Sequence, residues 1–301
     1  MNKKKIVIFG GQGFIGLNLA KYFLKYYKSQ LILIGNKSSL KNKIFLKKER
    51  KRIIFCENDI FDLKKVEKLE LKNSIVIFAA LKKDKLKLKI LNQIKNLLIC
   101  LNNKQVRSFF LLSSVSVYGN FSKSLSENIK TKPLNDYAKN CLNIEKLCSK
   151  IFSKSLTNLI ILRIAQPFGK FNLKYGLIEK ILKFYLKKAK FTFNDIDLIR
   201  SHISALKLVK IIDNLSKKKI NNEIINVANP FYVFSFNELI DKMNNILGFK
   251  RTINFKKQQY IIKKSICYAT KLQKKYGIKF QNSFSFEIKE VIKYFRKYEW
   301  S

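Results

Sequence analysis

The sequence predicts an α/β protein built around a doubly wound parallel sheet, with a smaller mixed portion towards its C-terminal end. Three observations support this fold class. Short, wholly apolar runs recur along residues 5–165, helical patterns separate most of them, and a glycine-rich turn follows the first run. Strands that are apolar on both sides and alternate with helices are typical of a parallel sheet covered on both faces.

The expected elements follow from these runs and from helical periodicity. Strands are expected over 5–11, 30–35, 52–59, 73–81, 106–114 and 156–165. Helices are expected after the glycine turn and over 86–103 and 137–153. Beyond about residue 166 the pattern is less regular, and the expected elements are helices over 206–218, 235–247 and 285–298 and a strand over 223–229. Ser235 and Glu238 form the pattern of a capping box at a helix start.

The chain of 301 residues is long enough for one large α/β unit or two modest domains. We expect residues 1–168 to form a dinucleotide-binding domain, to which 199–228 return. Residues 169–198 and 229–301 are expected to form the smaller, substrate-binding portion.

The formal net charge of +42, from 62 Lys and Arg against 20 Asp and Glu, raises the hypothesis of nucleic-acid binding. The lysines are spread along the whole chain, however, and the abundance of Lys, Asn, Ile and Phe beside only three prolines indicates biased codon usage. We therefore expect no nucleic-acid partner. The charge would still attract an anionic small molecule.

Cysteine usage and hydropathy indicate a cytoplasmic protein. The five cysteines form no C-x-x-C pair and no metal-ligand spacing, which suits a reducing compartment, and no metal site is expected. The apolar run near the N-terminus has only four residues before Gly10, too few for a signal peptide. No stretch approaches the roughly 18 apolar residues of a membrane span.

The motif "GGQGFIG" at residues 10–16 carries the first functional prediction. Gly10, Gly13 and Gly16 permit a tight turn, close approach to a pyrophosphate and close packing of the following helix. That helix opens with Phe14 and Ile15, and its free N–H groups would face the phosphates. In its context of strand, turn and helix, the motif predicts a dinucleotide cofactor.

The end of the second strand bears on which dinucleotide is used. An Asp or Glu there would hold the adenosine ribose 2′-hydroxyl of NAD. The chain instead has Gly35, followed by Asn36 and Lys37, which favours the 2′-phosphate of NADP over NAD. The alternative is that Lys37 is one more lysine of a lysine-rich chain.

Several motifs together resemble the extended short-chain dehydrogenase/reductases, that is, the NAD-dependent epimerase/dehydratase family. The motifs are "GGQGFIG", "END" with Asp59 and Ile60, "FAA" at 78–80, "LLSSVSVYG" at 111–119, Tyr137, "ILRIAQPFG" at 161–169, "IRSHISALKLV" at 199–209 and "CYATKLQKKYGI" at 267–278. They occur in the family's order and cover nearly the whole chain. The resemblance implies a Rossmann-type fold but does not identify the substrate.

The resemblance implies roles for individual residues. Tyr137 would exchange a proton with a sugar hydroxyl, Ser114 would hydrogen-bond the same oxygen, and Asn92 would support the site. Asp59, Ile60, Ala79, Ala80 and Cys141 would border the cofactor, and Ser116 and Arg200 would contact the substrate, the arginine through its diphosphate. The lone histidine, His202, is expected to be structural.

The sequence departs from the family where chemistry is concerned. The family pattern is Tyr-x-x-x-Lys, and Cys141 stands at the lysine. A tyrosine with its ordinary pKa near 10 is a poor base at neutral pH without a cation. Lys139 cannot replace the lysine, because two residues along a helix point about 200° around its axis. The stretch before Asn92 is also shorter than usual, which predicts a more open pocket.

Two hypotheses about function follow. The first is an NAD(P)-dependent nucleotide-sugar 4-epimerase or 4-keto reductase, because the acidic residues that a 4,6-dehydratase carries just after the serine are absent after Ser114. The second is a cofactor-binding but catalytically impaired family member that acts as a regulator or partner, which Cys141 keeps open. By analogy with the family, a homodimer would form through the helices over 86–103 and 137–153.

Overall fold

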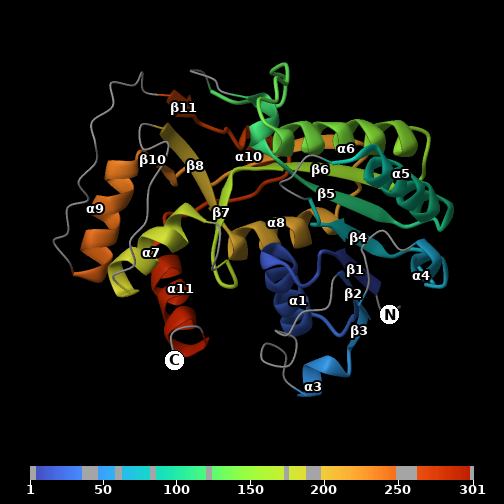
Figure 1. Ribbon diagram of the computed structural model, residues 1–301, viewed down its shortest axis with the longest axis horizontal. Helices are drawn as coiled ribbons and strands as arrows, with labels where there is room; N and C mark the ends of the chain where they lie inside the picture. Colours follow the sequence, from blue (N-terminus) through green and yellow to red (C-terminus); the bar gives the residue numbers. More distant parts are fainter. Residues whose placement is uncertain are drawn as a thin grey trace. The chain divides into compact units, whose positions relative to one another are not determined.

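The structure, a computed structural model, describes residues 5–35, 47–57, 63–81, 86–119, 124–172, 176–187, 198–248 and 263–298. It is an α/β protein with a seven-stranded sheet and a four-stranded sheet (Figure 1). The chain divides into two compact units. The first contains 1–119, 131–163 and 209–225, and the second contains 120–130, 164–208 and 226–301.

The seven-stranded sheet has the strand order β3-β2-β1-β4-β5-β6-β9. Its strands are β1 (Lys5–Phe9), β2 (Gln30–Gly35), β3 (Ile53–Glu57), β4 (Ile75–Phe78), β5 (Ser108–Ser114), β6 (Asn158–Ile164) and β9 (Glu223–Val227). In its first half β1 lies parallel to both β2 and β4, so that Val7 stands opposite Ile32 and Val76. The strand order reverses between β1 and β4, and parallel sheets bind ligands at the carboxyl ends of such strands.

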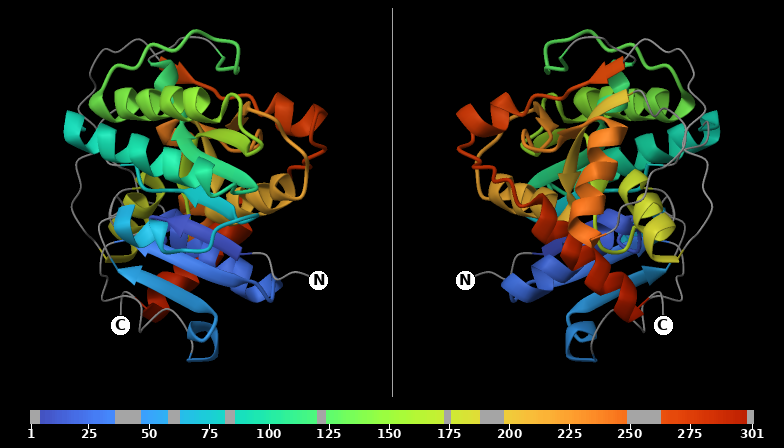
Figure 2. Two further views of the ribbon diagram at one scale, coloured as in Figure 1. Left: turned by 90° about the vertical axis from the view of Figure 1, so that its right-hand side faces the viewer. Right: turned by 90° about the vertical axis from the view of Figure 1, so that its left-hand side faces the viewer.

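Helices cover both faces of this sheet. On one face lie α4 (Leu63–Glu67), α5 (Leu88–Asn103) and α6 (Asp136–Phe152), with α5 and α6 side by side (Figure 2). The other helices of the first unit are α1 (Phe14–Tyr26), the short α3 (Lys47–Arg50) and most of α8 (Ala205–Ser216). Figure 1 shows α1 and α8 on the side of the sheet opposite α5 and α6.

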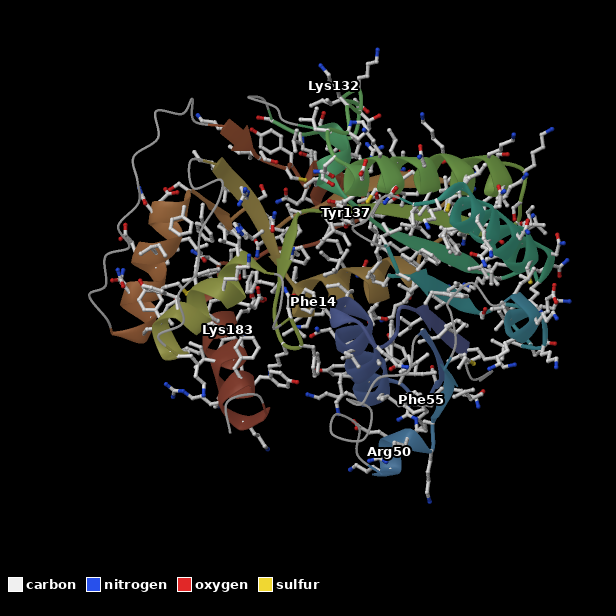
Figure 3. The ribbon with its side chains drawn as sticks, viewed as in Figure 1. Phe14, Arg50, Phe55, Lys132, Tyr137 and Lys183 are labelled. Carbon is white, nitrogen blue, oxygen red and sulfur yellow. The ribbon has the colours of Figure 1, made fainter. Side chains whose placement is uncertain are left out.

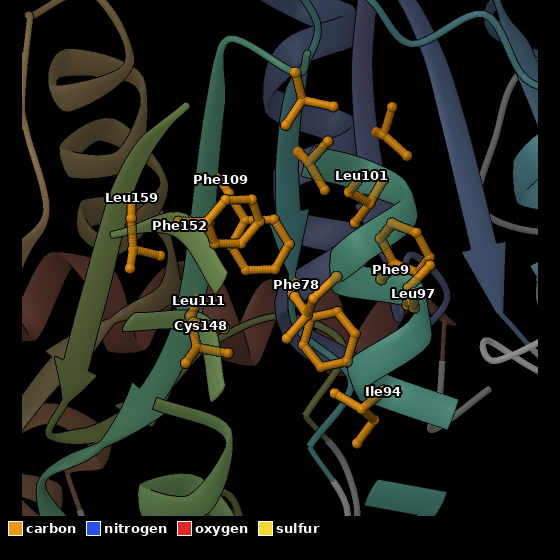
Figure 4. Packing of buried hydrophobic residues seen from close by; sticks show 14 of the residues in the cluster. Phe9, Phe78, Ile94, Leu97, Leu101, Phe109, Leu111, Cys148, Phe152 and Leu159 are labelled. Carbon is orange, nitrogen blue, oxygen red and sulfur yellow. The ribbon is translucent and has the colours of Figure 1, made fainter. Parts of the chain in front are cut away.

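The alternating side chains of the strands explain why the strands are apolar throughout. Val7 and Phe9 pack in the cluster that α5 and α6 cover, whereas Ile6 and Ile8 are equally buried and point to the opposite face. In the first of these layers the ring of Phe109 on β5 stacks on Phe152 of α6, with centroids 5.1 Å apart (Figure 4). Both faces of the sheet are thus closed to water.

The second unit contains the smaller sheet, in which β8 (Leu198–Ser204) pairs with β7 (Gln166–Phe168), β10 (Val233–Phe234) and β11 (Lys263–Ser265). Its helices are α7 (Leu177–Lys187), α9 (Phe236–Leu247), α10 (Thr270–Lys274) and α11 (Phe284–Tyr298). The capping box is confirmed: the Ser235 hydroxyl accepts from the Glu238 N–H, and the Glu238 carboxylate accepts from the Ser235 N–H.

The predicted elements of the first unit are confirmed, with ends that shift by a few residues. The expected smaller mixed portion is confirmed, but its strands β7, β8, β10 and β11 and the helices α3, α4, α7 and α10 were not among the expected elements. Strands β7, β10 and β11 have only two or three residues, and β8 mixes Arg200, Ser201 and His202 with apolar residues. Such strands lack the continuous apolar run that identifies a buried strand. None of the helices in the described ranges is long and apolar enough to cross a membrane.

Candidate active site

The glycine turn between β1 and α1 packs against the end of β4. Gly10 has a positive φ of 74°, and a Cβ there would lie 2.7 Å from the Ala79 carbonyl oxygen. A Cβ on Gly16 would lie 2.2 Å from the carbonyl oxygen of Gly10. The turn therefore requires glycine at both positions, and it lies against the backbone of Ala79 and Ala80.

The start of α1 presents unpaired polar groups. Gly13 is its N-cap and supplies no side-chain cap for the N–H groups of Phe14 and Ile15, so the positive end of the helix dipole has no side-chain cap. Figure 3 labels Phe14, the first residue of α1. The side-chain amide of Gln12 is buried at both its nitrogen and its oxygen, and neither atom has a hydrogen-bond partner in the described part of the chain. A tight glycine cradle beside an orphaned amide fits the phosphates of a dinucleotide.

Gly35 is the buried last residue of β2. A Cβ on Gly35 would have its nearest neighbours, backbone atoms of Gly10 and Gly11, at 3.9 Å, so a side chain there would begin beside the glycine turn without a clash. The predicted residues Asn36, Lys37, Asp59 and Ile60 lie outside the described residues.

Helix α6 carries Tyr137 on the face that it turns to the sheet. The N-cap of the helix is Asn135, whose side chain accepts from the Ala138 N–H at 2.8 Å. Tyr137, Cys141 and Glu145 follow at intervals of one turn; Cys141 is fully buried and Glu145 is 2 % exposed. Lys139 is exposed, in agreement with the expectation that it points away from Tyr137.

Hydroxyl groups at the end of β5 meet Tyr137. Ser114 ends β5, and a short 3-10 helix over Val115–Tyr118 follows. The Ser114 hydroxyl oxygen accepts from the Ser116 N–H at 3.2 Å and from the Ser116 hydroxyl at 2.9 Å. Ser114 and Cys141 both lie close enough to Tyr137 to act on the pKa of its hydroxyl group, Ser114 lowering it and Cys141 raising it. The structure thus brings together Tyr137, Ser114, Ser116 and Cys141.

The surroundings of Tyr137 hold its hydroxyl group in the neutral form. Burial is the largest cause that raises the pKa of Tyr137 well above its usual range, and Cys141 adds to the increase while Ser114 opposes it. Burial likewise raises the pKa of the Cys141 thiol to about 12. Within the described ranges, the side chains that act on Tyr137 include no lysine or arginine.

A buried ion pair is formed by Glu145, the residue one turn after Cys141 on α6. The Arg163 guanidinium donates to Glu145 through Nη2 at 2.7 Å and Nε at 3.2 Å, and the Ser113 hydroxyl donates to Glu145 Oε1 at 2.5 Å. The guanidinium also lies over the ring of Tyr118, 4.8 Å from its centroid. Sequence reasoning missed Ser113 and Arg163. The one signal that could have found them was an acidic residue on the buried face of a helix.

Asn92 is exposed on α5, so its side chain does not join the buried row of Tyr137 and Cys141. A different amide is buried on the helix that carries Tyr137. Asn140 of α6 is buried, and its Oδ1 accepts from the Leu86 N–H at 3.3 Å. The neighbour of Asn92, Gln93, has a buried Oε1 with no partner among the described residues.

Arg200 belongs to the second unit, where it is half-buried on β8 between Phe234 and Ser265 of the flanking strands. His202, two residues further along β8, is buried beside Phe234 with ring centroids 5.9 Å apart. Burial lowers the pKa of His202 to about 4, so the imidazole is neutral near pH 7. The described residues contain no cluster of His, Cys, Asp or Glu that could hold a metal ion.

Comparison with known proteins gives matches along most of the chain. A family model described as the NAD dependent epimerase/dehydratase family matches residues 6–228. An uncharacterized UDP-glucose epimerase of Bacillus subtilis (strain 168) is 25% identical over 269 residues, which cover 83% of this chain and 84% of that protein.

Solved structures share the fold at lower identity. A UDP-N-acetylglucosamine 4-epimerase from Methanobrevibacter ruminantium M1, in complex with UDP-N-acetylmuramic acid, has a TM-score of 0.84 at 21% identity and covers 99% of both chains. A UDP-glucuronic acid 4-epimerase from Bacillus cereus, in complex with NAD, has a TM-score of 0.82 at 21% identity over 98% of this chain and 99% of that one. A dTDP-glucose 4,6-dehydratase from Bacillus anthracis str. Ames, in complex with NAD, scores 0.82 at 17% identity over 98% and 97%.

Proposed function

The chain belongs to the NAD-dependent epimerase/dehydratase family, and from that premise we propose that it is a nucleotide-sugar 4-epimerase or 4-keto reductase. The observation that carries this proposal is that Tyr137 of α6 and Ser114 at the end of β5 lie close enough for the serine to act on the pKa of the tyrosine, in the unit that also holds the glycine turn. The relatives described above include UDP-sugar 4-epimerases, which supports a nucleotide sugar as substrate.

The reaction needs a group that takes and returns the proton of one sugar hydroxyl. Tyr137 serves as that acid and base, and Ser114 hydrogen-bonds the same sugar oxygen and holds it against the tyrosine. Ser116 fixes the position of Ser114 through the two hydrogen bonds described above. When bound, the nicotinamide cofactor supplies the acceptor and donor of hydride. The phosphates and the middle portion of the cofactor would be held by the glycine turn, the start of α1 and the end of β4. These residues are Gly10, Gly13, Gly16, Phe14, Ile15, Ala79 and Ala80.

Elimination chemistry is disfavoured by the residues that follow Ser114. A 4,6-dehydration must also move a proton from a neighbouring carbon and eject a hydroxyl group, which needs a further acid and base. The two residues that follow Ser114, Val115 and Ser116, carry no group that acts as an acid or base near pH 7. Oxidation and reduction at a single carbon fit these residues better.

We further propose that the cofactor is NADP in preference to NAD, because β2 ends in Gly35 and offers no carboxylate to the ribose 2′-hydroxyl at that position. The known structures in complex with NAD make this the point most in need of a test.

Arg200 is the proposed ligand of the substrate diphosphate. A homodimer through α5 and α6 is proposed because Leu88 and Ile99 of α5 are 73% and 39% exposed.

The test is to incubate the purified protein with UDP-glucose, UDP-N-acetylglucosamine or UDP-glucuronic acid, with each nicotinamide cofactor added in turn. An epimerase yields the 4-epimer, seen by NMR of the anomeric proton, without net cofactor consumption. A reductase consumes NADPH when a UDP-4-keto sugar is supplied. Tyr137→Phe should lower either rate by at least about 10²-fold, whereas Tyr26→Phe, at a 56% exposed position, should not.

Cys141 favours a second candidate, a cofactor-binding family member without turnover. This member would be stabilised by the nucleotide, because binding to the folded state alone adds about 2.7 kcal/mol at 100 times Kd. It would leave every sugar nucleotide unchanged, and Tyr137→Phe would alter nothing. Cofactor-dependent stabilisation combined with complete absence of turnover would therefore decide for this candidate.

A further inference from the structure

The side chain of Gln12, the third residue of the glycine turn, ends in a buried amide. Its Nε2 and its Oε1 are both shielded from solvent, and neither has a hydrogen-bond partner among the described residues. Burying an amide in this way is unfavourable, because the group loses its hydrogen bonds to water and gains none from the protein. A buried polar group left in this state calls for an explanation, and a ligand that completes its hydrogen bonds is one.

The backbone on either side of Gln12 shows which elements it joins. The N–H of Gly11 donates to the Ile34 carbonyl oxygen at 3.2 Å, and a Cβ on Gly11 would lie 2.9 Å from Cβ of Leu33. The turn therefore rests on the end of β2 just before Gln12. The residue just after it, Gly13, is the N-cap of α1. Gln12 thus stands between the end of β2 and the start of α1.

These two elements face different parts of a bound dinucleotide. In a doubly wound fold the adenosine ribose lies at the end of the second strand, and the pyrophosphate lies at the start of the first helix. The end of β2 has Gly35 and therefore no side chain for the ribose at that position. The start of α1 has backbone N–H groups without a side-chain cap. The side chain between these two positions belongs to Gln12.

We propose that Gln12 is a cofactor-binding residue, whose Nε2 donates to a phosphate oxygen of the dinucleotide and whose Oε1 accepts from an adenosine ribose hydroxyl. The proposal rests on the nicotinamide cofactor of the proposed function. A side-chain amide suits both contacts, because it has two N–H donors and an acceptor oxygen. Unlike a carboxylate it has no charge that would repel a phosphate. Gln12 therefore compensates for the missing acid at the end of β2 without selecting against a 2′-phosphate.

A binding role predicts opposite effects on stability and on affinity. Gln12→Leu keeps a side chain of similar size but buries no polar atom. The ligand-free variant should therefore melt about 2 °C or more above the unaltered protein, because the unpartnered amide is gone. Its affinity for the cofactor should fall at the same time. If the amide instead held the turn together, Gln12→Leu would lower the Tm.

The affinity test uses ADP-ribose and 2′-phospho-ADP-ribose in isothermal titration calorimetry, since neither contains nicotinamide and no turnover is involved. We expect Gln12→Leu to raise Kd about 10-fold or more, through loss of a hydrogen bond to a charged group. Gln12→Glu, which brings a negative charge to the phosphates, should raise Kd about 10²-fold. A loss that is equal for both ligands assigns Nε2 to the pyrophosphate. A loss that is larger for 2′-phospho-ADP-ribose assigns it to the 2′-phosphate.

The matched control is Ser74→Ala. The Ser74 hydroxyl is also buried without a partner in the described ranges, but it directly precedes β4 and so lies at the amino end of that strand, away from the glycine turn. Its removal should leave both Kd values unchanged.

Unchanged Kd values in Gln12→Leu, or a lowered Tm of this variant without ligand, would overturn the role of Gln12. Unchanged affinity in a protein that converts sugar nucleotides would leave the proposed function standing. Conversely, Gln12-dependent binding in a protein that converts none would uphold the role of Gln12 and overturn the proposed function. Binding of neither ligand by the unaltered protein would overturn the role of Gln12 together with the proposed cofactor.

Discussion

Cys141 follows Tyr137 one turn further along α6, and each of the two groups acts on the pKa of the other. A neutral sulfur at this position does nothing to stabilise a phenolate, and burial of both groups opposes ionisation. Among the described residues, the acid–base role proposed for Tyr137 would therefore rely on neutral groups, in contrast to the Tyr-x-x-x-Lys pattern.

The variant Cys141→Lys should lower the pKa of Tyr137. An ammonium group one turn from the phenol favours the charged phenolate, so the ionisation of Tyr137 should move from far above pH 10 towards the neutral range. The measurement is ultraviolet difference titration of Cys141→Lys against the double variant that also carries Tyr137→Phe. Unchanged titration would show that the new ammonium does not reach the hydroxyl group.

Gly35→Asp should change the choice of cofactor. The new carboxylate would begin beside the glycine turn, where it can pair with a ribose 2′-hydroxyl and repel a 2′-phosphate. We expect NADP to raise the Tm of the unaltered protein more than NAD does, and the order to reverse in Gly35→Asp. Gly35→Ala is the control for the added Cβ and should keep the original order. Greater stabilisation by NAD in the unaltered protein would refute the NADP preference.

Glu145→Gln should destabilise the fold by about 3 kcal/mol, because it leaves the Arg163 guanidinium buried without its counter-charge. Replacing both partners, as in Glu145→Gln with Arg163→Met, should cost less than either single variant, since no lone charge then stays buried. Urea unfolding of the four proteins forms a double-mutant cycle. Strictly additive losses would show that the pair is not coupled.

Glu179 should make the stability of the protein depend on pH. This carboxyl group is fully buried on α7, where its Oε1 accepts from the Gly169 N–H at 2.9 Å, and burial raises its pKa to about 8. Below about pH 4.5 it is protonated in both the folded and unfolded states. Between about 4.5 and 8 the folded state binds the additional proton, so its contribution to stability falls as pH rises.

Glu179→Gln keeps the shape and the acceptor for Gly169 but does not titrate. Chemical unfolding at pH 5 and at pH 7.5 should show a loss in the unaltered protein on the order of 3 kcal/mol relative to Glu179→Gln. Glu290→Gln, at an exposed ion pair with Lys170, is the control and should not reproduce this difference. Parallel pH dependences of the unaltered protein and Glu179→Gln would exclude the assignment.

Much of the first unit could be predicted from local pattern. A strand buried on both faces must be apolar throughout, and the turn requires glycine because a Cβ on Gly10 would lie 2.7 Å from the Ala79 carbonyl oxygen, so both features are visible in the residues themselves. The one-turn spacing of Tyr137 and Cys141 follows from helix geometry alone. The amino-acid sequence by itself therefore determines that no lysine follows Tyr137 at the family's spacing.

The partners of these residues depended on packing between distant segments. Ser113 reaches Glu145 across 32 residues and Arg163 reaches it across 18, and no periodicity predicts which hydroxyl or guanidinium will meet a buried carboxylate. The exposure of Asn92 was equally unpredictable, since a rotation of α5 by one position decides whether Asn92 or Gln93 turns inward. Short-range pattern specifies the strands, helices and turns, whereas the polar contacts below Tyr137 exist only once α6 lies in register on β5 and β6.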